Sequence, residues 1–378
     1  MKKILLVAQS LSGGGTEISL TEFINHLDVQ DYDITLLLLD SDNDFAKRIN
    51  RKISIKYLKF DNSFWHDIVS MKALEGKVIK KITLNHELKI YDLVLAHIQS
   101  SAFDTRYDLA IDYYGYGSFT TALVAKKINA QKKATWLHDA KMPWVKNVER
   151  YIPRFNRIFC VSKTIKSVFD TRYPEYTDKS EVFYNFINKK YIIKKSEEFV
   201  PQEFKKDVFN IVSVGRLTEQ KGFDIALKAA KILQNKNVNF KWFVIGDGKD
   251  RKKLNRQLHK LKLDNCFFFL GSKSNPYPYV KNADLFVLPS RHEGFGIATL
   301  EARILKKIVI VSDIPVSREQ IINGKNGLLS KLTPEDLSKC ILKIYSDRNL
   351  NKKMYEYINN EKIDFDGEIN KIKHLLKE

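Results

Sequence analysis

The chain has 378 residues, which at ~150 residues per domain favours two domains. Hydrophobic residues make up 44% and charged residues 29%, proportions that exclude a disordered, collagen-like or low-complexity protein. The formal net charge of +19 favours an anionic partner: nucleic acid, an anionic lipid surface or a phosphorylated small molecule. The widely spaced Cys160, Cys266 and Cys340 contain no CxxC pair, which argues against a disulfide framework or a zinc site and fits a reducing cytosol.

In the first half of the chain, short apolar runs alternate with longer amphipathic ones, as in parallel sheets covered by helices. We expect strands at 3–7, 34–39, 93–96, 109–111, 134–137, 157–161 and 182–184. Helices are expected at 117–128 and at 163–169, the second with Ser162 as its N-cap. The polar stretch from Asn188 to Glu198 is predicted to be a linker. No apolar run approaches the ~20 residues that span a bilayer.

A second series begins with a strand at 209–215. Further strands are expected at 241–245, 266–270, 285–288 and 308–311, and helices at 225–233, 251–260 and 300–305. The sequence therefore predicts an α/β protein of two Rossmann-like domains, 1–190 and 205–365, with a C-terminal helix in 366–378 that packs back on the first. Ligands of such folds bind at the carboxyl ends of the strands, so two facing domains would place the site in the cleft between them.

The first candidate site is the run from Ser12 to Glu17 between the first strand and a helix. Consecutive glycines, among them Gly14 and Gly15, let backbone N–H groups approach a phosphate or a sugar, and the helix adds its positive end. A tight turn from strand to helix would also use glycine, so this motif by itself is weak.

The second candidate is the turn from Gly215 to Gly222, which holds Arg216 and Lys221. An arginine and a lysine five residues apart in such a turn can converge on one anion, and a diphosphate suits them. The alternative is a solvated basic loop.

The third candidate is the run from Ser290 to Glu301. Glu293 lies in a glycine-rich turn and Glu301 follows eight residues later, just over two helical turns. One carboxylate can accept hydrogen bonds from both ribose hydroxyls, and the backbone of the Gly-Phe-Gly turn can donate to phosphate oxygens. The alternative for Glu301 is a first-turn glutamate favoured by the helix dipole.

Together these motifs resemble the C-terminal domain of family 4 glycosyltransferases, which are retaining enzymes of the GT-B fold. The resemblance rests on the Glu-x7-Glu pair, on 283–290, 215–217, 220–222 and 246–248, and covers about residues 209–330. It extends more loosely to the first domain through Gly13 to Gly15 and His138. Arg303 departs from it, because the family commonly has a small or apolar residue there.

The resemblance implies a role for each matching residue. The donor diphosphate would be bound by Arg216, Lys221, Gly14, Gly15, Gly296 and Ile297. The donor sugar would be held by Glu293, Gly294 and Phe295, the ribose by Glu301, and the base by Ser272 and Lys273. His138 and Glu293 would be the catalytic residues. Retention in this family is commonly assigned to same-face attack assisted by the leaving phosphate, so Glu293 is not expected to be a nucleophile. A hydrolase with an acid and a base stays open.

Asp40-Ser41-Asp42 has the form of a metal-binding DxD motif. In a loop this rich in Asp and Asn, a turn or a helix cap is the better interpretation. We expect no metal and no cofactor, only a nucleotide-sugar donor, a UDP- or GDP-sugar.

Lys and Arg strongly outnumber Asp and Glu between 126 and 172, where Trp144, Val145, Val148, Tyr151 and Ile152 recur at helical spacing. Such an element is expected to lie on an anionic membrane surface; the alternative is a core-facing helix. Nucleic acid is not expected as a partner, since no nucleic-acid-binding motif is present.

The resemblance implies a glycan or lipid-linked acceptor in cell-surface polysaccharide synthesis, and a cytoplasmic protein, peripheral on the cytoplasmic face of the membrane. Two alternatives stay open: a nucleotide-sugar epimerase or phosphorylase on the same fold, and a non-catalytic basic protein that binds nucleic acid or membrane.

Overall fold

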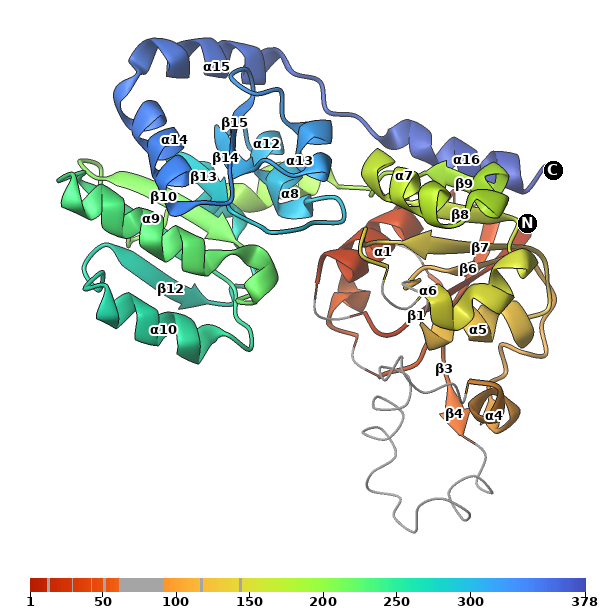
Figure 1. The fold of residues 1–378 in the computed structure, drawn as a ribbon. Helices are drawn as coiled ribbons and strands as arrows, with labels where there is room; N and C mark the ends of the chain where they lie inside the picture. The colour runs from red at the N-terminus through yellow and green to blue at the C-terminus, as the bar shows by residue number, and fades with distance from the viewer. Residues whose placement is uncertain are drawn as a thin grey trace. The chain divides into compact units, whose positions relative to one another are not determined.

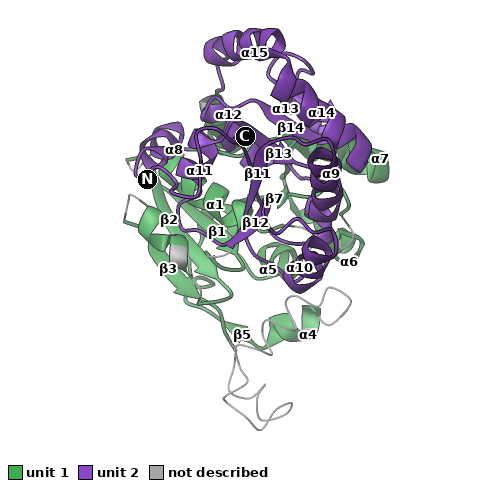
Figure 2. Cartoon of the chain, turned by 90° about the vertical axis from the view of Figure 1, so that its left-hand side faces the viewer, with its two compact units in different colours: residues 1–187, 364–378 green, residues 188–363 purple. Residues whose placement is uncertain are grey.

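The structure is a computed structural model that describes residues 1–11, 14–28, 30–41, 43–49, 52–60, 91–115, 118–142 and 145–378 (Figure 1). The chain divides into two compact units (Figure 2). The first unit consists of Met1–Ile187 and Asp364–Glu378, and the second of Asn188–Ile363. Each unit is built around its own parallel sheet.

The sheet of the first unit has the strand order β3-β2-β1-β6-β7-β8-β9, with every pair parallel. Its strands are β1 (Lys2–Ala8), β2 (Tyr32–Leu38), β3 (Ser54–Tyr57), β6 (Tyr107–Asp112), β7 (Ala130–Leu137), β8 (Arg157–Cys160) and β9 (Ser180–Val182). The short strands β4 (Lys59–Phe60) and β5 (Ile98–Gln99) pair separately. Parallel strands need crossovers, and here most of these are helical.

Helices cover both faces of this sheet. They are α1 (Gly15–His26), α4 (Tyr91–Ala96), α5 (Phe119–Lys126), α6 (Val145–Val148), α7 (Lys163–Arg172) and α16 (Ile369–Leu375), with the 3-10 helices η1 (Asp44–Arg48), η3 (Glu149–Arg154), η4 (Pro174–Lys179) and η6 (Asp366–Glu368). α4 and α5 share one apolar core with the sheet. On the other face, Phe23 of α1 packs against Tyr113 and Trp136. α16 lies against β9, where Lys371 Nζ donates to the carbonyl oxygen of Val182 at 2.6 Å.

The second unit has the strand order β12-β11-β10-β13-β14-β15, again parallel throughout. Its strands are β10 (Phe209–Val214), β11 (Phe240–Ile245), β12 (Phe267–Gly271), β13 (Leu285–Leu288), β14 (Val309–Ser312) and β15 (Gly327–Ser330). Its helices are α8 (Lys189–Ser196), η5 (Glu219–Lys221), α9 (Phe223–Asn235), α10 (Arg251–Lys260), α11 (Tyr277–Asn282), α12 (Ile297–Ile304), α13 (Pro315–Gln320), α14 (Pro334–Ser346) and α15 (Arg348–Asn360). Side chains of α9, α10, α14 and α15 form one apolar core against the sheet.

Both units are therefore Rossmann-like, as the alternation of elements predicts. The Ser162 cap is present, because its Oγ accepts from the N–H of Ile165 at 3.1 Å. The strand predicted at 93–96 is wrong: these residues belong to helix α4. Tyr91, Val94, Leu95 and Ile98 are buried, which is the spacing of a helix face, and a short apolar run does not separate helix from strand.

The stretch predicted as a linker is also structured. It contains α8, whose first turn is capped by Asn188 Oδ1 accepting from the N–H of Tyr191 at 2.9 Å. Ile192 is buried and α8 packs against α11. Four lysines around two isoleucines had hidden a short amphipathic helix, so the second unit begins at residue 188 rather than near 205.

Candidate active site

In the second sheet, β10 and β13 lie side by side while the chain connections leave them toward opposite edges. At such a switch point the loops at the carboxyl ends of the two strands separate and leave a crevice. Two of the predicted motifs start here: residues 215–222 follow β10, and residues 289–296 follow β13. The strand order thus brings the basic turn and the glycine-rich acidic turn together.

Gly222 allows the two turns to approach so closely. Its φ of 68° is in the left-handed region, and a Cβ at this position would lie 1.9 Å from the carbonyl oxygen of Pro289. No side chain fits at that distance. Gly222 therefore fixes the start of α9 against the end of β13.

Lys221 and Glu293 form an ion pair across the switch point. Lys221 Nζ lies 2.6 Å from Glu293 Oε1, and the two side chains are only 14% and 11% exposed. Ser290 Oγ donates to the same carboxylate oxygen at 2.6 Å. Two motifs 72 residues apart thus place a cation and a carboxylate at one point.

The backbone of the two turns is joined beside this pair. The N–H of Arg291 donates to the carbonyl oxygen of Gln220 at 2.7 Å, and Gln220 Nε2 donates to that of His292 at 3.0 Å. Arg291 also forms two 2.8 Å bonds to the carboxylate of Asp224 in α9. Burial alone would raise the pKa of Asp224, but the Arg291 guanidinium holds that pKa below its ordinary value. Sequence reasoning missed this clamp, because no spacing links residues 224 and 291.

Arg216 is exposed in the turn that follows β10, and its guanidinium has no hydrogen-bond or ion-pair partner among the described residues. Its neighbour Leu217 is buried, and the N–H of Leu217 donates to the carbonyl oxygen of Asp247 at 2.9 Å. The predicted 246–248 motif therefore lies against the basic turn. A fixed backbone with an exposed guanidinium suits an incoming anion.

The turn from Gly294 to Gly296 leads into α12, which Ile297 begins. Gly296 is the N-cap residue, with a φ of 81° in the left-handed region. The first N–H groups of a helix lack partners within it and carry partial positive charge. Gly296 and Ile297 therefore lie at the positive end of α12, and their contact with phosphate oxygens stays a prediction.

Glu301 lies on α12, where its Oε1 accepts a 2.9 Å hydrogen bond from the hydroxyl of Tyr277. Tyr277 is 4% exposed and begins α11. Sequence reasoning missed Tyr277, since an apolar-aromatic run gave no sign of a polar contact. Ser272 and Lys273 are exposed after the edge strand β12. They lie at the same end of the sheet as the other site residues, but β11 separates β12 from β10.

In the first unit, the switch point falls between β1 and β6. Gly14 is the N-cap of α1, with extended backbone, and Gly15 is the first helical residue. They therefore occupy the positive end of a helix beside the switch point, as predicted. Ser12 and Gly13 lie outside the described residues.

His138 follows β7 and is 7% exposed. Its Nε2 lies 2.7 Å from the carbonyl oxygen of Tyr113, so Nε2 carries the proton and donates it. Burial lowers the pKa of His138 to about 4, against a smaller opposing effect of this bond. The imidazole is therefore neutral near neutral pH and is held in one tautomer.

A buried carboxyl that sequence reasoning did not select lies at the end of β6. Asp112 accepts from Thr121 Oγ1 at 2.5 Å, from Thr135 Oγ1 at 2.8 Å and from the N–H of Gly115 at 3.0 Å. Burial raises the pKa of Asp112 despite these bonds. Asp112 thus joins the ends of β6 and β7 to the turn before α5.

The predicted membrane-binding face requires correction. Val145, Val148, Tyr151 and Ile152 are at most 3% exposed, so their helical spacing reflects core packing. Trp144 lies outside the described residues. Arg150, on the polar side, pairs with Asp92 at 2.8 Å. No apolar face is left on these residues to enter a lipid surface, and any contact with a membrane would rest on charge.

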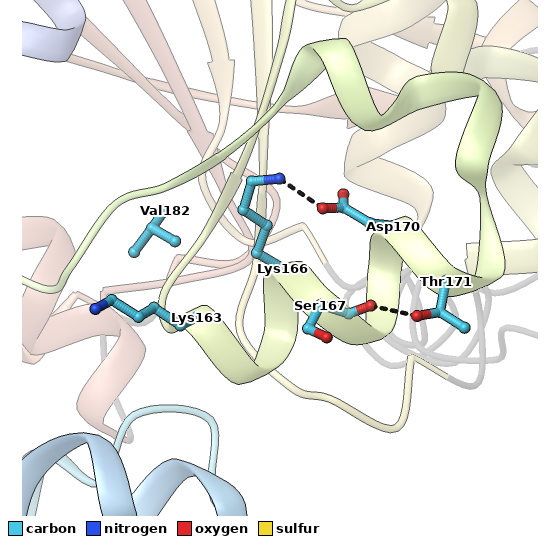
Figure 3. Close-up of a pocket in the computed structure, with 6 residues that line it drawn as sticks. All are labelled: Lys163, Lys166, Ser167, Asp170, Thr171 and Val182. Atoms are coloured by element: carbon cyan, nitrogen blue, oxygen red, sulfur yellow. Dashed lines mark hydrogen bonds and ion pairs between the residues drawn. The ribbon is translucent and has the colours of Figure 1, made fainter.

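A pocket of about 400 Å³ lies elsewhere in the first unit, along α7 (Figure 3). Lys166 points to Asp170 with a 2.5 Å ion pair, and Thr171 Oγ1 donates to the Ser167 carbonyl oxygen at 2.8 Å. None of its lining residues belongs to the predicted site.

Asp42 of the DxD motif lies outside the described residues. The part of the chain that the structure describes contains no group of three or more His, Cys, Asp or Glu side chains placed to hold a metal ion. Nor does it contain a helix with the length and apolar character of a membrane span.

Known proteins are similar to this chain in sequence and in fold. Residues 194–361, within the second unit, match the family model described as glycosyl transferases group 1. An uncharacterized glycosyltransferase of Methanocaldococcus jannaschii is 28% identical over 310 residues, 79% of either chain. The N,N'-diacetylbacillosaminyl-diphospho-undecaprenol alpha-1,3-N-acetylgalactosaminyltransferase of Campylobacter jejuni is 28% identical over 213 residues, 56% of this chain and 51% of that protein.

Among solved structures, HepE of Anabaena, determined with UDP and glucose, matches over 100% of both chains with a TM-score of 0.74 at 18% identity. The predicted GT-B fold, two Rossmann-like domains in one chain, is confirmed. Fold, family model and relatives together support one class of protein, a GT-B glycosyltransferase.

Proposed function

We propose that this protein is a retaining glycosyltransferase that moves a sugar from a nucleoside-diphosphate sugar to a glycan or lipid-linked acceptor, in the synthesis of a cell-surface polysaccharide. The Lys221–Glu293 pair at the switch point, with the exposed Arg216 in the same turn as Lys221, is the observation that carries the proposal. The Campylobacter relative, by its name, transfers a sugar to a diphospho-undecaprenol-linked acceptor, which supports the proposed acceptor class.

In this proposal the diphosphate binds Arg216, Lys221 and the N–H groups of Gly296 and Ile297. Arg216 has no partner to give up among the described residues, whereas Lys221 exchanges Glu293 for phosphate. Glu293 is then released toward the sugar, with Gly294 and Phe295. Glu301 receives the ribose hydroxyls, and Ser272 and Lys273 contact the base.

The proposed reaction breaks the bond between the anomeric carbon and the leaving phosphate oxygen, which keeps the electron pair. The acceptor hydroxyl attacks from the same face, and its proton passes to that phosphate oxygen. Negative charge grows on the diphosphate during this step, so Arg216 and Lys221 act where the transition state needs them. No metal is required for this countercharge.

Gly14, Gly15 and His138 belong to the first unit, and their contacts with the donor stay predictions. The imidazole is neutral and buried, and its Nε2–H donates to the carbonyl oxygen of Tyr113. It therefore suits a positioning or hydrogen-bonding role better than proton transfer at Nε2.

A thermal-shift panel of UDP, GDP, ADP, dTDP and CMP, with and without EDTA, tests the donor site. A ligand at 100 times its Kd adds about 2.7 kcal/mol to the free energy of unfolding. We expect one nucleoside diphosphate to raise the Tm, without an effect of EDTA, and Glu301→Ala to abolish the rise. Glu335→Ala, an exposed glutamate of α14, is the control and should keep it. If no nucleoside diphosphate raises the Tm, the proposed donor site is overturned.

A further inference from the structure

Arg303 is a buried arginine on α12, seven residues after Gly296, where the proposed donor turn ends. Its Nη2 donates to Glu361 Oε1 at 2.8 Å, and the two side chains are only 9% and 12% exposed. Burying two charges is costly, and apolar residues of similar volume commonly give equal stability. Stability alone is therefore a weak reason for an ion pair at this position.

The other end of the guanidinium leads to the donor turn. Arg303 Nη1 lies 3.4 Å from Gln320 Oε1, and Gln320 Nε2 donates to the carbonyl oxygen of Phe295. Gln320 is 7% exposed at the end of α13. A single amide thus receives Arg303 on its oxygen and holds the backbone between Gly294 and Gly296 with its nitrogen.

Glu361 lies two residues before the end of the second unit at Ile363. Its Oε1 also accepts from Asn326 Nδ2 at 2.7 Å, and Asn326 Nδ2 lies 3.1 Å from the carbonyl oxygen of Gln320. Lys306, just after α12, donates to the carbonyl oxygen of Ile358 at 2.7 Å. The segment where the chain leaves the unit is therefore fastened to α12 and to the residue that holds Phe295.

We propose that Arg303 is a positioning residue of the donor site, which acts through Gln320 to hold the Phe295 carbonyl and so ties the Gly294–Gly296 turn to the exit segment at Glu361. The proposal rests on the proposed function, which places the donor at this turn. It gives a reason for arginine where the resembling family commonly has a small or apolar residue. If so, the buried charges of Arg303 and Glu361 keep the Gly294–Gly296 turn in one conformation and thereby raise its affinity for the donor.

The test uses variants of the full chain that distinguish a loss of conformational order in the Gly294–Gly296 turn from a general loss of stability. Arg303→Met with Glu361→Gln removes both charges and leaves an acceptor for Asn326, so no buried charge is stranded. Gln320→Leu cuts the same connection at its last step. Ile341→Val, in the apolar core with α9, is the control, because it lowers stability without touching the connection.

Two readouts are measured beside the Tm: hydrogen exchange of the peptide 294–300 in the unliganded protein, and the Kd of the nucleoside diphosphate selected by the thermal-shift panel. For the double variant and for Gln320→Leu, we expect exchange of this peptide to become about tenfold faster and binding about tenfold weaker. In Ile341→Val, with a Tm lowered as in the other variants, the exchange rate of this peptide and the Kd should both equal the wild-type values.

Wild-type exchange and affinity in the double variant would overturn the proposal while the donor site stands. So would changes that merely follow the Tm, as shown by equal effects in Ile341→Val. If the wild type binds none of the nucleoside diphosphates, the proposed function fails and the positioning role fails with it.

Discussion

Lys221 Nζ and Glu293 Oε1 lie 2.6 Å apart, so a proposed ligand of the diphosphate and a proposed ligand of the sugar neutralise each other before the donor binds. A diphosphate must compete with Glu293 for Lys221. In Glu293→Gln the lysine is released, and we expect the nucleoside diphosphate to bind at least roughly fivefold more tightly, because it no longer has to displace a carboxylate from Lys221. Transfer should fall by at least about 100-fold, because the sugar contact is lost. Calorimetry and a transfer assay measure the two effects.

A matched control for this variant is Asp313→Asn, which breaks the 2.7 Å ion pair with Arg318 on the surface of the same unit. It should change neither affinity nor transfer. Weaker binding of the nucleoside diphosphate in Glu293→Gln would contradict the competition, since it would make Glu293 a support of the diphosphate site.

Gly222 and Gly324 give a second test, because both have left-handed backbone, with φ of 68° and 81°. A Cβ at Gly324 would meet nothing within 4 Å, whereas one at Gly222 would lie 1.9 Å from the Pro289 carbonyl oxygen. Gly324→Ala should cost about 1–2 kcal/mol, the backbone penalty alone. Gly222→Ala should cost several kcal/mol more and separate the two turns, since overpacking is added. Urea unfolding compares them; equal costs would show that the approach of the turns does not depend on Gly222.

The sequence predicted those features of the site that neighbouring residues determine. Runs of apolar residues located most strands of both sheets, and charged residues with glycines at strand ends located the 215–222 and 290–301 turns. The sequence did not predict contacts between residues from different crossovers. Arg291 with Asp224 and Tyr277 with Glu301 are two such contacts, and only the strand order brings these residues together.

Two of the misassigned segments of the described chain fail for related reasons. At 93–96, four apolar residues fit a strand or a helix, and burial decides between them. At 145–152, helical spacing of apolar and basic residues fits a membrane surface or a protein core, and the core of the first unit takes the apolar side. In both cases the spacing of apolar residues is read correctly, but the spacing does not determine what those residues pack against in the folded protein.

His138 gives a prediction about pH. Its pKa of about 4 in the folded protein lies below the ordinary 6.5, so folding favours the neutral form. The resulting stabilisation is complete above about pH 6.5 and is lost as the pH falls toward 4. Between about pH 7.5 and pH 4.5 the wild type should therefore lose roughly 2–3 kcal/mol that His138→Gln does not lose. Urea unfolding at both pH values measures the difference.

The control for His138 is His374→Gln in α16, whose imidazole is 77% exposed. This variant should show the wild-type dependence on pH. If His138→Gln also shows the wild-type dependence on pH, the loss of stability in acid comes from other groups and not from the buried imidazole of His138.

Tyr277 tests whether Glu301 must be oriented before the donor arrives. Tyr277→Phe removes only the hydroxyl that donates to Glu301 Oε1 at 2.9 Å, and leaves the buried ring in place. We expect at least roughly tenfold weaker binding of the nucleoside diphosphate, the effect of one hydrogen bond to a charged group, with a small change in Tm. Tyr279→Phe on the same helix is the matched control: its ring is similarly buried and its hydroxyl, 3.2 Å from Glu203 Oε1, does not reach Glu301. Equal affinities in the two variants would mean that Glu301 needs no orientation by Tyr277. A loss of affinity confined to Tyr277→Phe would show that Tyr277 orients Glu301 for its contact with the ribose.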